Sequence, residues 1–198
     1  MMADPNVPAP TDGAPLSRGR RWTLLVGSVV VVLLLDQLTK WWAVSQLAPP
    51  PEGNGRIVDV VASLRFRYAE NTGMAFSRGA ESGRWIGLLV IIVVVVMVYF
   101  ATRVRSPGLV VTLGVVVGGA LGNLLDRLLR AEDGWLSGAV VDFIDLQWWP
   151  VFNVADAAVV VGGIVLVLLA TREPEATTGR EADRQDPAAP AGGEEGVG

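Results

Sequence analysis

Four aspartates lie inside or beside long apolar stretches of the sequence: Asp36, Asp126, Asp142 and Asp156. A charged side chain deep in an apolar span costs about 2.5 to 3.5 kcal/mol, so each aspartate needs a partner or a function. The 198 residues include no His and no Cys, which excludes Ser-His-Asp and Cys-His catalysis and the usual zinc sites. Two neighbouring carboxylates that share one proton are the simplest remaining device for hydrolysis.

Polar partners accompany the first two aspartates at helical spacing. Asp36 and Lys40 are four residues apart, which predicts one helix face, although a simple ion pair that eases insertion has the same spacing. Asn123, Asp126 and Arg127 place an amide, a carboxylate and a guanidinium on one face. We expect Asp126 and Arg127 to form a bidentate network that holds neighbouring groups.

The other two aspartates stand at the start of a later apolar stretch. Asn153 and Asp156 are three residues apart on its expected first turn, and Asp142 lies between Val and Phe in the preceding connection. This apolar setting is expected to raise the pKa of Asp142. Asp145 is the rival within the connection, but its position beside a Trp pair is more typical of an acid at the membrane interface.

Four apolar stretches must position these groups. They cover residues 22–44, 85–101, 109–125 and 151–170, and the chain is 51% hydrophobic with 18% charged residues. Each stretch is long enough to cross a hydrocarbon core of about 30 Å as a helix. The net charge of −4 argues against a nucleic-acid partner. Residues 1–20 and 173–198 are predicted to be disordered tails outside the membrane domain of residues 21–172.

Residues near the ends of the stretches indicate the topology. An even number of spans puts both tails on one side, and the short connection 102–108 carries two Arg, which favours cytoplasmic tails. Total Arg counts on the two sides do not settle the orientation. The aromatic belt of a membrane protein is expected from Trp residues at the span ends, with a seventh in a connecting loop: Trp22, Trp41, Trp42, Trp85, Trp148, Trp149 and Trp135.

The two long connections are expected to hold structure of their own. In residues 45–84, the alternation of apolar and basic residues from Leu64 to Tyr68 predicts a short strand of a small sheet on the membrane. Asn71 and Gly73, in NTGMAFS (71–77), could return an amide to the membrane surface, or form an ordinary turn. Within the third stretch, Gly114, Gly118 and Gly122 predict a close helix contact.

The residues alone leave the function open. Spacing does not choose which two aspartates would act as a pair. A carboxylate cluster in a helical bundle is also consistent with a proton-coupled carrier or a cation site. A carrier is expected to spread its acids through the depth of the spans, whereas these gather near one surface. A purely structural anchor would not need Asp, Asn and Arg together in costly positions.

Five sequence blocks decide among these alternatives. Taken in order, DQLTK, NTGMAFS, GGALGNLLDR, VVDF and FNVADAAVVVG resemble the motifs of the bacterial lipoprotein signal peptidase family, also called signal peptidase II, over residues 36–162. The resemblance implies an all-α membrane aspartic peptidase with four transmembrane helices, a small extracytoplasmic β-rich cradle and an interfacial loop or helix. Its substrates would be prolipoproteins, cleaved before a Cys that carries diacylglycerol.

The same resemblance implies roles for individual residues. Asp142 and Asp156 would be the catalytic pair, near the outer surface of the bacterial cytoplasmic (inner) membrane, with both termini in the cytoplasm. Other matched positions would line or brace the site: Asp36, Lys40, Asn71, Gly73, Asn123, Asp126, Arg127, Asn153 and Ala155. No metal or organic cofactor is expected, and the chain is expected to act as a monomer. The connection 128–139 is longer than in most of the family and could alter substrate entry, while Glu132 and Asp133 in it are expected to be solvated.

Overall fold

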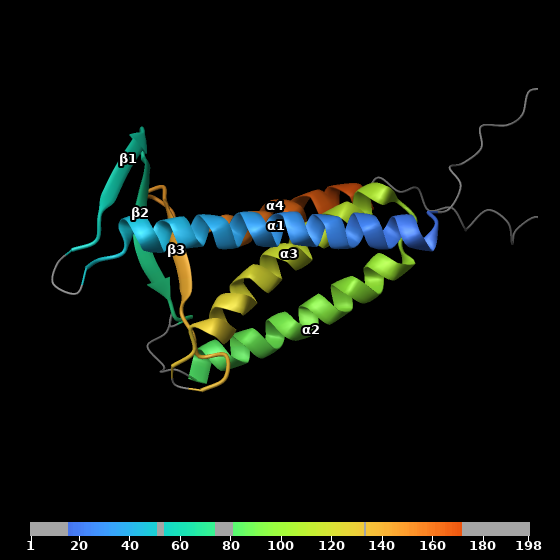
Figure 1. Cartoon of the computed structure of the whole chain (residues 1–198). Helices are drawn as coiled ribbons and strands as arrows, with labels where there is room; N and C mark the ends of the chain where they lie inside the picture. The colour runs from blue at the N-terminus through green and yellow to red at the C-terminus, as the bar shows by residue number, and fades with distance from the viewer. Residues whose placement is uncertain (1–15, 51–53, 74–80, 133, 172–198) are drawn as a thin grey trace, which may run out of the picture.

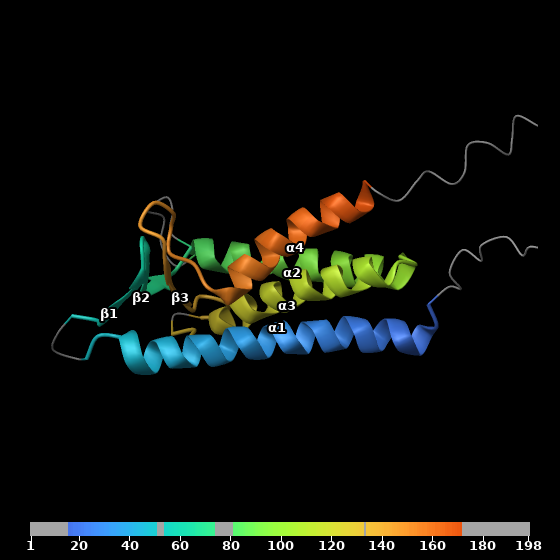
Figure 2. The same ribbon diagram turned by 90° about the horizontal axis from the view of Figure 1, so that it is seen from above.

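Four helices form a bundle, and a three-stranded sheet covers one end of it (Figure 1). The computed structural model describes residues 16–50, 54–73, 81–132 and 134–171. The elements follow in the order α1 (Arg18–Leu47), β1 (Ile57–Val61), β2 (Leu64–Asn71), α2 (Glu81–Arg103), α3 (Pro107–Leu129), β3 (Val140–Asp145) and α4 (Val154–Ala170). Helix α3 packs against each of the other three helices (Figure 2).

Three helices in the described part are long and apolar enough to cross a membrane: Arg18–Leu47, Arg84–Arg103 and Pro107–Leu129. Helix α4 is equally apolar but has 17 residues, which corresponds to about 25 Å. The prediction that the fourth helical stretch begins at residue 151 is wrong. Phe152 forms an isolated bridge with Ile144, and Asn153 caps the helix, so the first helical residue is Val154.

Glycines allow α3 to approach α1 closely, as the sequence predicted. A Cβ atom at Gly118 would lie 2.9 Å from the carbonyl oxygen of Val29, and one at Gly114 would lie 2.9 Å from that of Leu25. At Gly122 an added Cβ would meet the carboxyl group of Asp36. A side chain at any of the three positions would therefore push the two helices apart.

The sheet has the order β1-β2-β3, and both pairs are antiparallel. The predicted strand at residues 64–68 is present and extends to Asn71. Strand β3 was not predicted, because its residues were assigned to a connection. Strand β2 contains a bulge with one extra residue. The segment from Phe66 to Ala69 has one residue more than the segment of β3 that it faces, from Ile144 to Asp142.

The outer edge of β3 is already hydrogen-bonded. The Val141 amide donates to Asp126 Oδ2 at 3.1 Å, and the Val141 carbonyl accepts from Asn153 Nδ2 at 3.3 Å. The amides of the fourth and fifth residues of the strand both donate to the Phe152 carbonyl. The edge opposite β2 is thus paired at each of these groups.

The Trp residues divide into two groups. Six are exposed, as expected for an aromatic belt and a loop: Trp22, Trp41, Trp85, Trp135, Trp148 and Trp149. Trp42 was expected in the belt but lies under the sheet, with its ring centroid 5.4 Å from that of Phe66 and 6.1 Å from that of Phe143. It joins the end of α1 to β2 and β3.

The predicted tails lie almost entirely outside the described residues, as do Asp133 and residues 74–77 of the NTGMAFS block. The described part begins at Leu16, and Ser17 caps α1 by accepting a hydrogen bond from the Arg20 amide at 3.3 Å. Helix α1 therefore includes the last three residues that were assigned to the first tail.

Candidate active site

Asp142 lies on β3 with 3% of its surface exposed. Its Oδ2 accepts a hydrogen bond from Asn71 Nδ2 at 3.0 Å, and its Oδ1 accepts one from Asn153 Nδ2 at 2.7 Å. Burial and the neighbouring charge of Asp156 raise the pKa of Asp142 to about 6, against the opposing effect of the two amide hydrogen bonds. This carboxyl group therefore holds a proton at a higher pH than an ordinary aspartate.

Asp156 lies in the first turn of α4, where Asn153 and Asp156 form a capping box. The Asp156 amide donates to Asn153 Oδ1 at 2.9 Å, and the Asn153 amide donates to Asp156 Oδ2 at 3.2 Å. The remaining oxygen, Oδ1, accepts from Asn123 Nδ2 at 2.7 Å. Asn153 thus bonds to both Asp142 and Asp156, and it is fully buried.

Lys40 is the only lysine of the sequence, and 1% of it is exposed. Its Nζ lies 2.8 Å from Asp36 Oδ2 and 3.0 Å from Asp126 Oδ2, and it donates to Asn123 Oδ1 at 2.9 Å. The expected pairing of Asp36 with Lys40 is confirmed. The group is larger than a simple ion pair, because one ammonium joins α1 to two polar residues of α3.

The two carboxylates bound to Lys40 also hold backbone next to the aspartate pair. Asp36 Oδ1 accepts from the amide of Ala155, the residue before Asp156, at 3.0 Å. Asp126 Oδ2 accepts from the amide of Val141, the residue before Asp142, at 3.1 Å. Lys40 therefore couples the start of α4 to β3 through charged side chains that are almost entirely buried.

The predicted bidentate pairing of Asp126 with Arg127 is wrong. Within the described residues, the ion partners of Asp126 are Lys40 and Arg130, whose Nε lies 3.6 Å from Asp126 Oδ1. Arg127 Nη1 donates instead to the Asn123 carbonyl at 3.3 Å. Neighbouring residues of a helix point in different directions, so Asp126 and Arg127 do not face each other.

Asn71 and Gly73 form a turn at the end of β2, and the same turn orients a site residue. The Gly73 amide donates to Asn71 Oδ1 at 3.0 Å, while Asn71 Nδ2 reaches Asp142. Gly73 has φ 77°, a conformation that glycine adopts without strain. The two interpretations of this segment, a turn and a part of the site, are therefore compatible.

Asp145 is buried in ion pairs with two arginines of β2. It is 2% exposed, and its Oδ2 lies 2.8 Å from Arg65 Nε and 2.6 Å from Arg67 Nε, while Oδ1 accepts from the Gln147 amide at 2.7 Å. Burial alone would raise the pKa of Asp145, but the hydrogen bonds from Arg67 and Arg65 outweigh it and hold the pKa at about 2. Asp145 therefore joins β3 to β2 as a group that stays charged at neutral pH.

We expect Asp145→Asn to lower stability without removing the hydrogen bonds of Asp142. The loss should be about 1 to 2 kcal/mol, because both guanidinium groups are half-buried and lose a charged acceptor. Because the folded pKa is about 2 against 3.8 for an ordinary aspartate, this contribution is complete above about pH 4 and disappears as the pH falls towards 2. Thermal unfolding of both proteins between pH 3 and 7 measures it, and a constant difference across that range would contradict the ion-pair explanation.

Two apolar grooves meet at Asp156. One, of about 380 Å³, lies between α2, α3 and α4 and is lined by Val93, Val116 and Val159 together with Asn123 and Asp156. The other, of about 450 Å³, follows α4 on the side of the Trp148–Trp149 pair. The carboxyl group of Asp156 is thus approached by two surfaces suited to apolar ligands.

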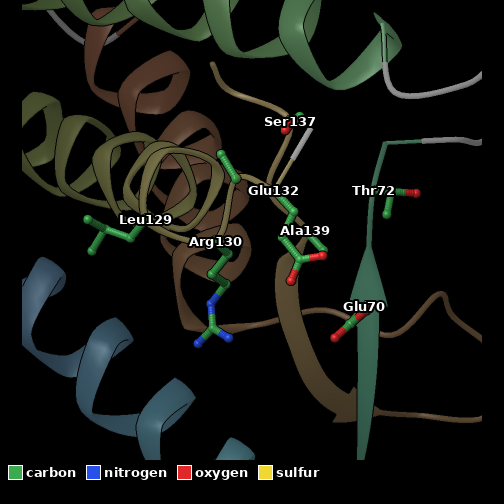
Figure 3. A pocket seen from close by; sticks show the side chains of 8 residues that line it. Glu70, Thr72, Leu129, Arg130, Glu132, Ser137 and Ala139 are labelled. Atoms are coloured by element: carbon green, nitrogen blue, oxygen red, sulfur yellow. The ribbon is translucent and has the colours of Figure 1, made fainter. Parts of the chain in front are cut away.

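A polar cavity of about 440 Å³ lies elsewhere, between the ends of β2 and α3 and the connection after α3 (Figure 3). Glu70, Arg130 and Glu132 line it. Glu70 pairs with Val141 across the sheet, so both point to one face, whereas Asp142, the next residue, points to the other. The residues of the connection that line this cavity, Ala131, Glu132, Ser137 and Ala139, therefore lie on the face of the sheet opposite to Asp142. Glu132 is exposed, as expected.

Sequence reasoning missed two members of the polar group. Gln37 Nε2 donates to Asp36 Oδ2 at 3.1 Å and to the Gly122 carbonyl at 3.3 Å. Arg130 is four residues after Asp126, so the usual helix spacing could have identified it. No pattern in the sequence distinguishes Gln37 from an ordinary polar residue at a helix surface.

Comparisons with known proteins agree with this arrangement. The family profile described as Signal peptidase (SPase) II matches residues 28–172. The lipoprotein signal peptidase of Mycobacterium tuberculosis is 44% identical over 84% of this chain and 76% of its own length. That of Rhodococcus jostii is 41% identical over 88% and 85%.

Two solved structures have a similar fold to this chain. Two chains described as a bacterial membrane enzyme are each 25% identical to this chain, with TM-scores of 0.64 and 0.65. They cover 81% and 84% of this chain, and 97% and 96% of their own lengths are matched. With a family match over most of the chain, relatives above 40% identity and a shared fold, this protein belongs to the signal peptidase II family of membrane peptidases.

Proposed function

We propose that this protein is a membrane aspartic endopeptidase that removes signal peptides from prolipoproteins. In this proposal, Asp142 and Asp156 activate the water that cleaves the bond before the diacylglyceryl-modified Cys. The observation that carries it is the contact of both carboxyl groups with the buried Asn153, whose side chain donates to Asp142 and whose backbone amide donates to Asp156, at the point where two apolar grooves meet.

The chemistry follows from the different settings of the two carboxyl groups. Asp142, whose pKa is raised to about 6, is suited to hold the shared proton and to donate it to the scissile carbonyl oxygen. Asp156 then accepts a proton from water as the water oxygen attacks the carbonyl carbon. Collapse of the resulting diol breaks the C–N bond: the leaving nitrogen takes up the proton held by Asp156, and one hydroxyl of the diol returns its proton to Asp142. Asn153 and Asn71 keep Asp142 in place throughout.

The two apolar grooves support a lipid-modified substrate. A prolipoprotein brings two apolar parts to the scissile bond, the signal peptide and the diacylglyceryl group. Two separate grooves reach Asp156, and both are lined mainly by apolar side chains. Acyl chains that remain in the bilayer would restrict the position of the Cys, so partition into the membrane would contribute to orientation.

In the proposed topology, α4 is a fourth span, the sheet lies outside the cytoplasmic membrane and both termini lie in the cytoplasm. Helix α1 begins and α4 ends at the end of the bundle opposite to the sheet (Figure 1). Arg103 and Arg105, around the short connection between α2 and α3, lie at that same end, which fits the preference of cytoplasmic connections for Arg.

Cleavage of a synthetic prolipoprotein peptide, with and without diacylglycerol on its Cys, tests the proposal. We expect the detergent-purified protein to cleave only the lipidated peptide at the bond before Cys, as identified by mass spectrometry of the products. Equal cleavage of both peptides would remove the lipid requirement. If neither peptide were cleaved, the proposed peptidase activity would be wrong, and a proton-coupled carrier would be the alternative to test.

The pH dependence of kcat/KM is expected to follow Asp142. Because this carboxyl group must be protonated, kcat/KM should fall as the pH rises through about 6. The hydrogen bond from Asn71 lowers the pKa of Asp142, so Asn71→Ala should raise that pKa and move the falling limb to higher pH. Asp59→Asn, an exposed carboxyl on β1, serves as the control and should leave the limb in place. If the fall of kcat/KM occurred at the same pH in Asn71→Ala as in the wild type, the pH dependence would not come from Asp142.

A further inference from the structure

Five arginines gather at the end of the bundle opposite to the sheet. Arg18, Arg20 and Arg21 lie in the first turn of α1, Arg103 ends α2, and Arg105 lies in the connection to α3. The start of α1, the end of α2 and the start of α3 lie at this end in both views (Figures 1 and 2). All five are exposed except Arg21, which is half-buried.

These arginines have no carboxylate partner in the described part of the chain. The ion pairs found there involve the sheet or the polar group beneath it, at the other end of the molecule. Among the residues that the structure describes, five positive charges therefore gather at this end without an acid paired to them. This arrangement favours an anionic ligand.

Arg21 is the best positioned of the five. Its Nη1 donates to the Thr102 carbonyl in the last turn of α2, which fixes the guanidinium between two helices. Its Nε is buried and has no hydrogen-bond partner among the described residues. The Arg21 charge has therefore lost part of its hydration, and an anion beside the guanidinium would offset that cost.

The two helix N-termini at this end lack acidic groups as well. The first turn of α1 contains no acid but three arginines, although this end of a helix favours negative charge. Ser106, the N-cap of α3, makes no side-chain capping bond, and the first turn of α3 also contains no acid. Both termini present backbone N–H groups to which an anion can bind.

Apolar side chains begin directly beside the arginines. Trp22 follows Arg21 and is 39% exposed, while Tyr99 and Phe100 are 54% and 53% exposed on the last turns of α2. The guanidinium of Arg103 lies 5.0 Å from the centre of the Tyr99 ring. A ligand here meets cationic groups at one level and an apolar surface at the next, as a phospholipid headgroup and its acyl chains would require.

We propose that Arg21, with the surrounding arginines, binds the phosphate of an anionic membrane phospholipid at this end of the bundle. The phosphate accepts hydrogen bonds from the accessible part of the Arg21 guanidinium and from the planar guanidinium groups around it, and the acyl chains lie along Trp22 and the end of α2. The site is independent of the aspartate pair and does not rest on the proposed peptidase activity.

The test uses the full chain in nanodiscs of phosphatidylcholine with or without phosphatidylglycerol. We expect phosphatidylglycerol to raise the unfolding temperature and to remain bound in native mass spectrometry. Arg21→Gln should weaken this binding about fivefold, the effect of one cation near a lipid phosphate. Arg84→Gln, the same change at an exposed position near the sheet end of α2, should bind as the wild type does.

Further arms separate the possible ligands. Arg21→Lys keeps the charge but not the planar group, so it should bind more weakly than the wild type, and equal binding would overturn the specific site. Equal stabilisation by inorganic phosphate in the absence of phosphatidylglycerol would show a free anion as the ligand instead. If phosphatidylglycerol has no effect while Arg21→Gln destabilises the protein in phosphatidylcholine, the partner of Arg21 belongs to the chain itself and the proposal is wrong.

Discussion

Asp142→Asn is expected to lower cleavage of a lipidated prolipoprotein peptide by about 10³-fold or more, and Asp156→Asn is expected to do the same. An amide at either position removes a carboxyl group that must hold or accept a proton during attack by water. Because the two carboxyl groups act as one unit, the double variant should be little worse than either single variant. Initial rates for the detergent-purified proteins at equal concentration measure the effect.

The matched control is Asp145→Asn, the same change three residues further along β3. It removes a buried carboxylate whose partners are Arg65 and Arg67, and it should retain cleavage. Unfolding temperatures show whether each variant is folded. If folded Asp142→Asn kept its activity while Asp145→Asn lost it, Asp145 would replace Asp142 as the catalytic residue.

Lys40→Met is expected to destabilise the protein by about 3 to 5 kcal/mol, a larger loss of stability than Asp145→Asn should cause. The substitution preserves much of the side-chain volume but leaves Asp36 and Asp126 buried without their shared cation. These carboxylates hold the amides next to the aspartate pair, so the cleavage rate should fall as well. Chemical or thermal unfolding in detergent measures the stability, and initial rates measure the activity.

A second substitution distinguishes the loss of charge from the loss of packing. In the Lys40→Met background, Asp36→Asn removes one uncompensated charge and keeps an oxygen for the Ala155 amide, so it should restore part of the stability. In the wild-type background the same change should be destabilising. Arg56→Met, which removes an exposed cation in the connection before β1, should have little effect. If Asp36→Asn had the same effect in both backgrounds, Lys40 and Asp36 would not be coupled.

The apolar helices and most members of the polar group could be predicted from the sequence. Long apolar runs identify helices regardless of their partners, and the rarity of charge within such runs identifies Asp36, Lys40, Asn123 and Asp126 as a set. The spacing of Asn153 and Asp156 also contained the capping box, since an N-cap amide and an acid three residues later form one.

Pairings between distant segments could not be predicted in this way. Asp145 meets residues of β2 that are 80 and 78 positions away in sequence, and nothing near Asp145 identifies them. Asp126 pairs with Lys40 and not with the expected Arg127. This pairing depends on how α1 packs on α3. Strand β3 is short and lies in a connection, and its pairing with β2 makes it a strand. Trp42 likewise resembles a belt residue until the sheet above it is known.

The paired outer edge of β3 restricts the ways in which ligands can reach Asp142. Extended peptides commonly bind by adding a strand to a free sheet edge, where backbone groups supply much of the affinity. Here a carboxylate, an amide and a carbonyl of the protein already hold those groups. An inhibitor designed as a strand mimic would find no ladder to join beside Asp142. A compact apolar compound that follows α4 to Asp156 would not need one, and its affinity would depend on shape and on contact with the two carboxyl groups.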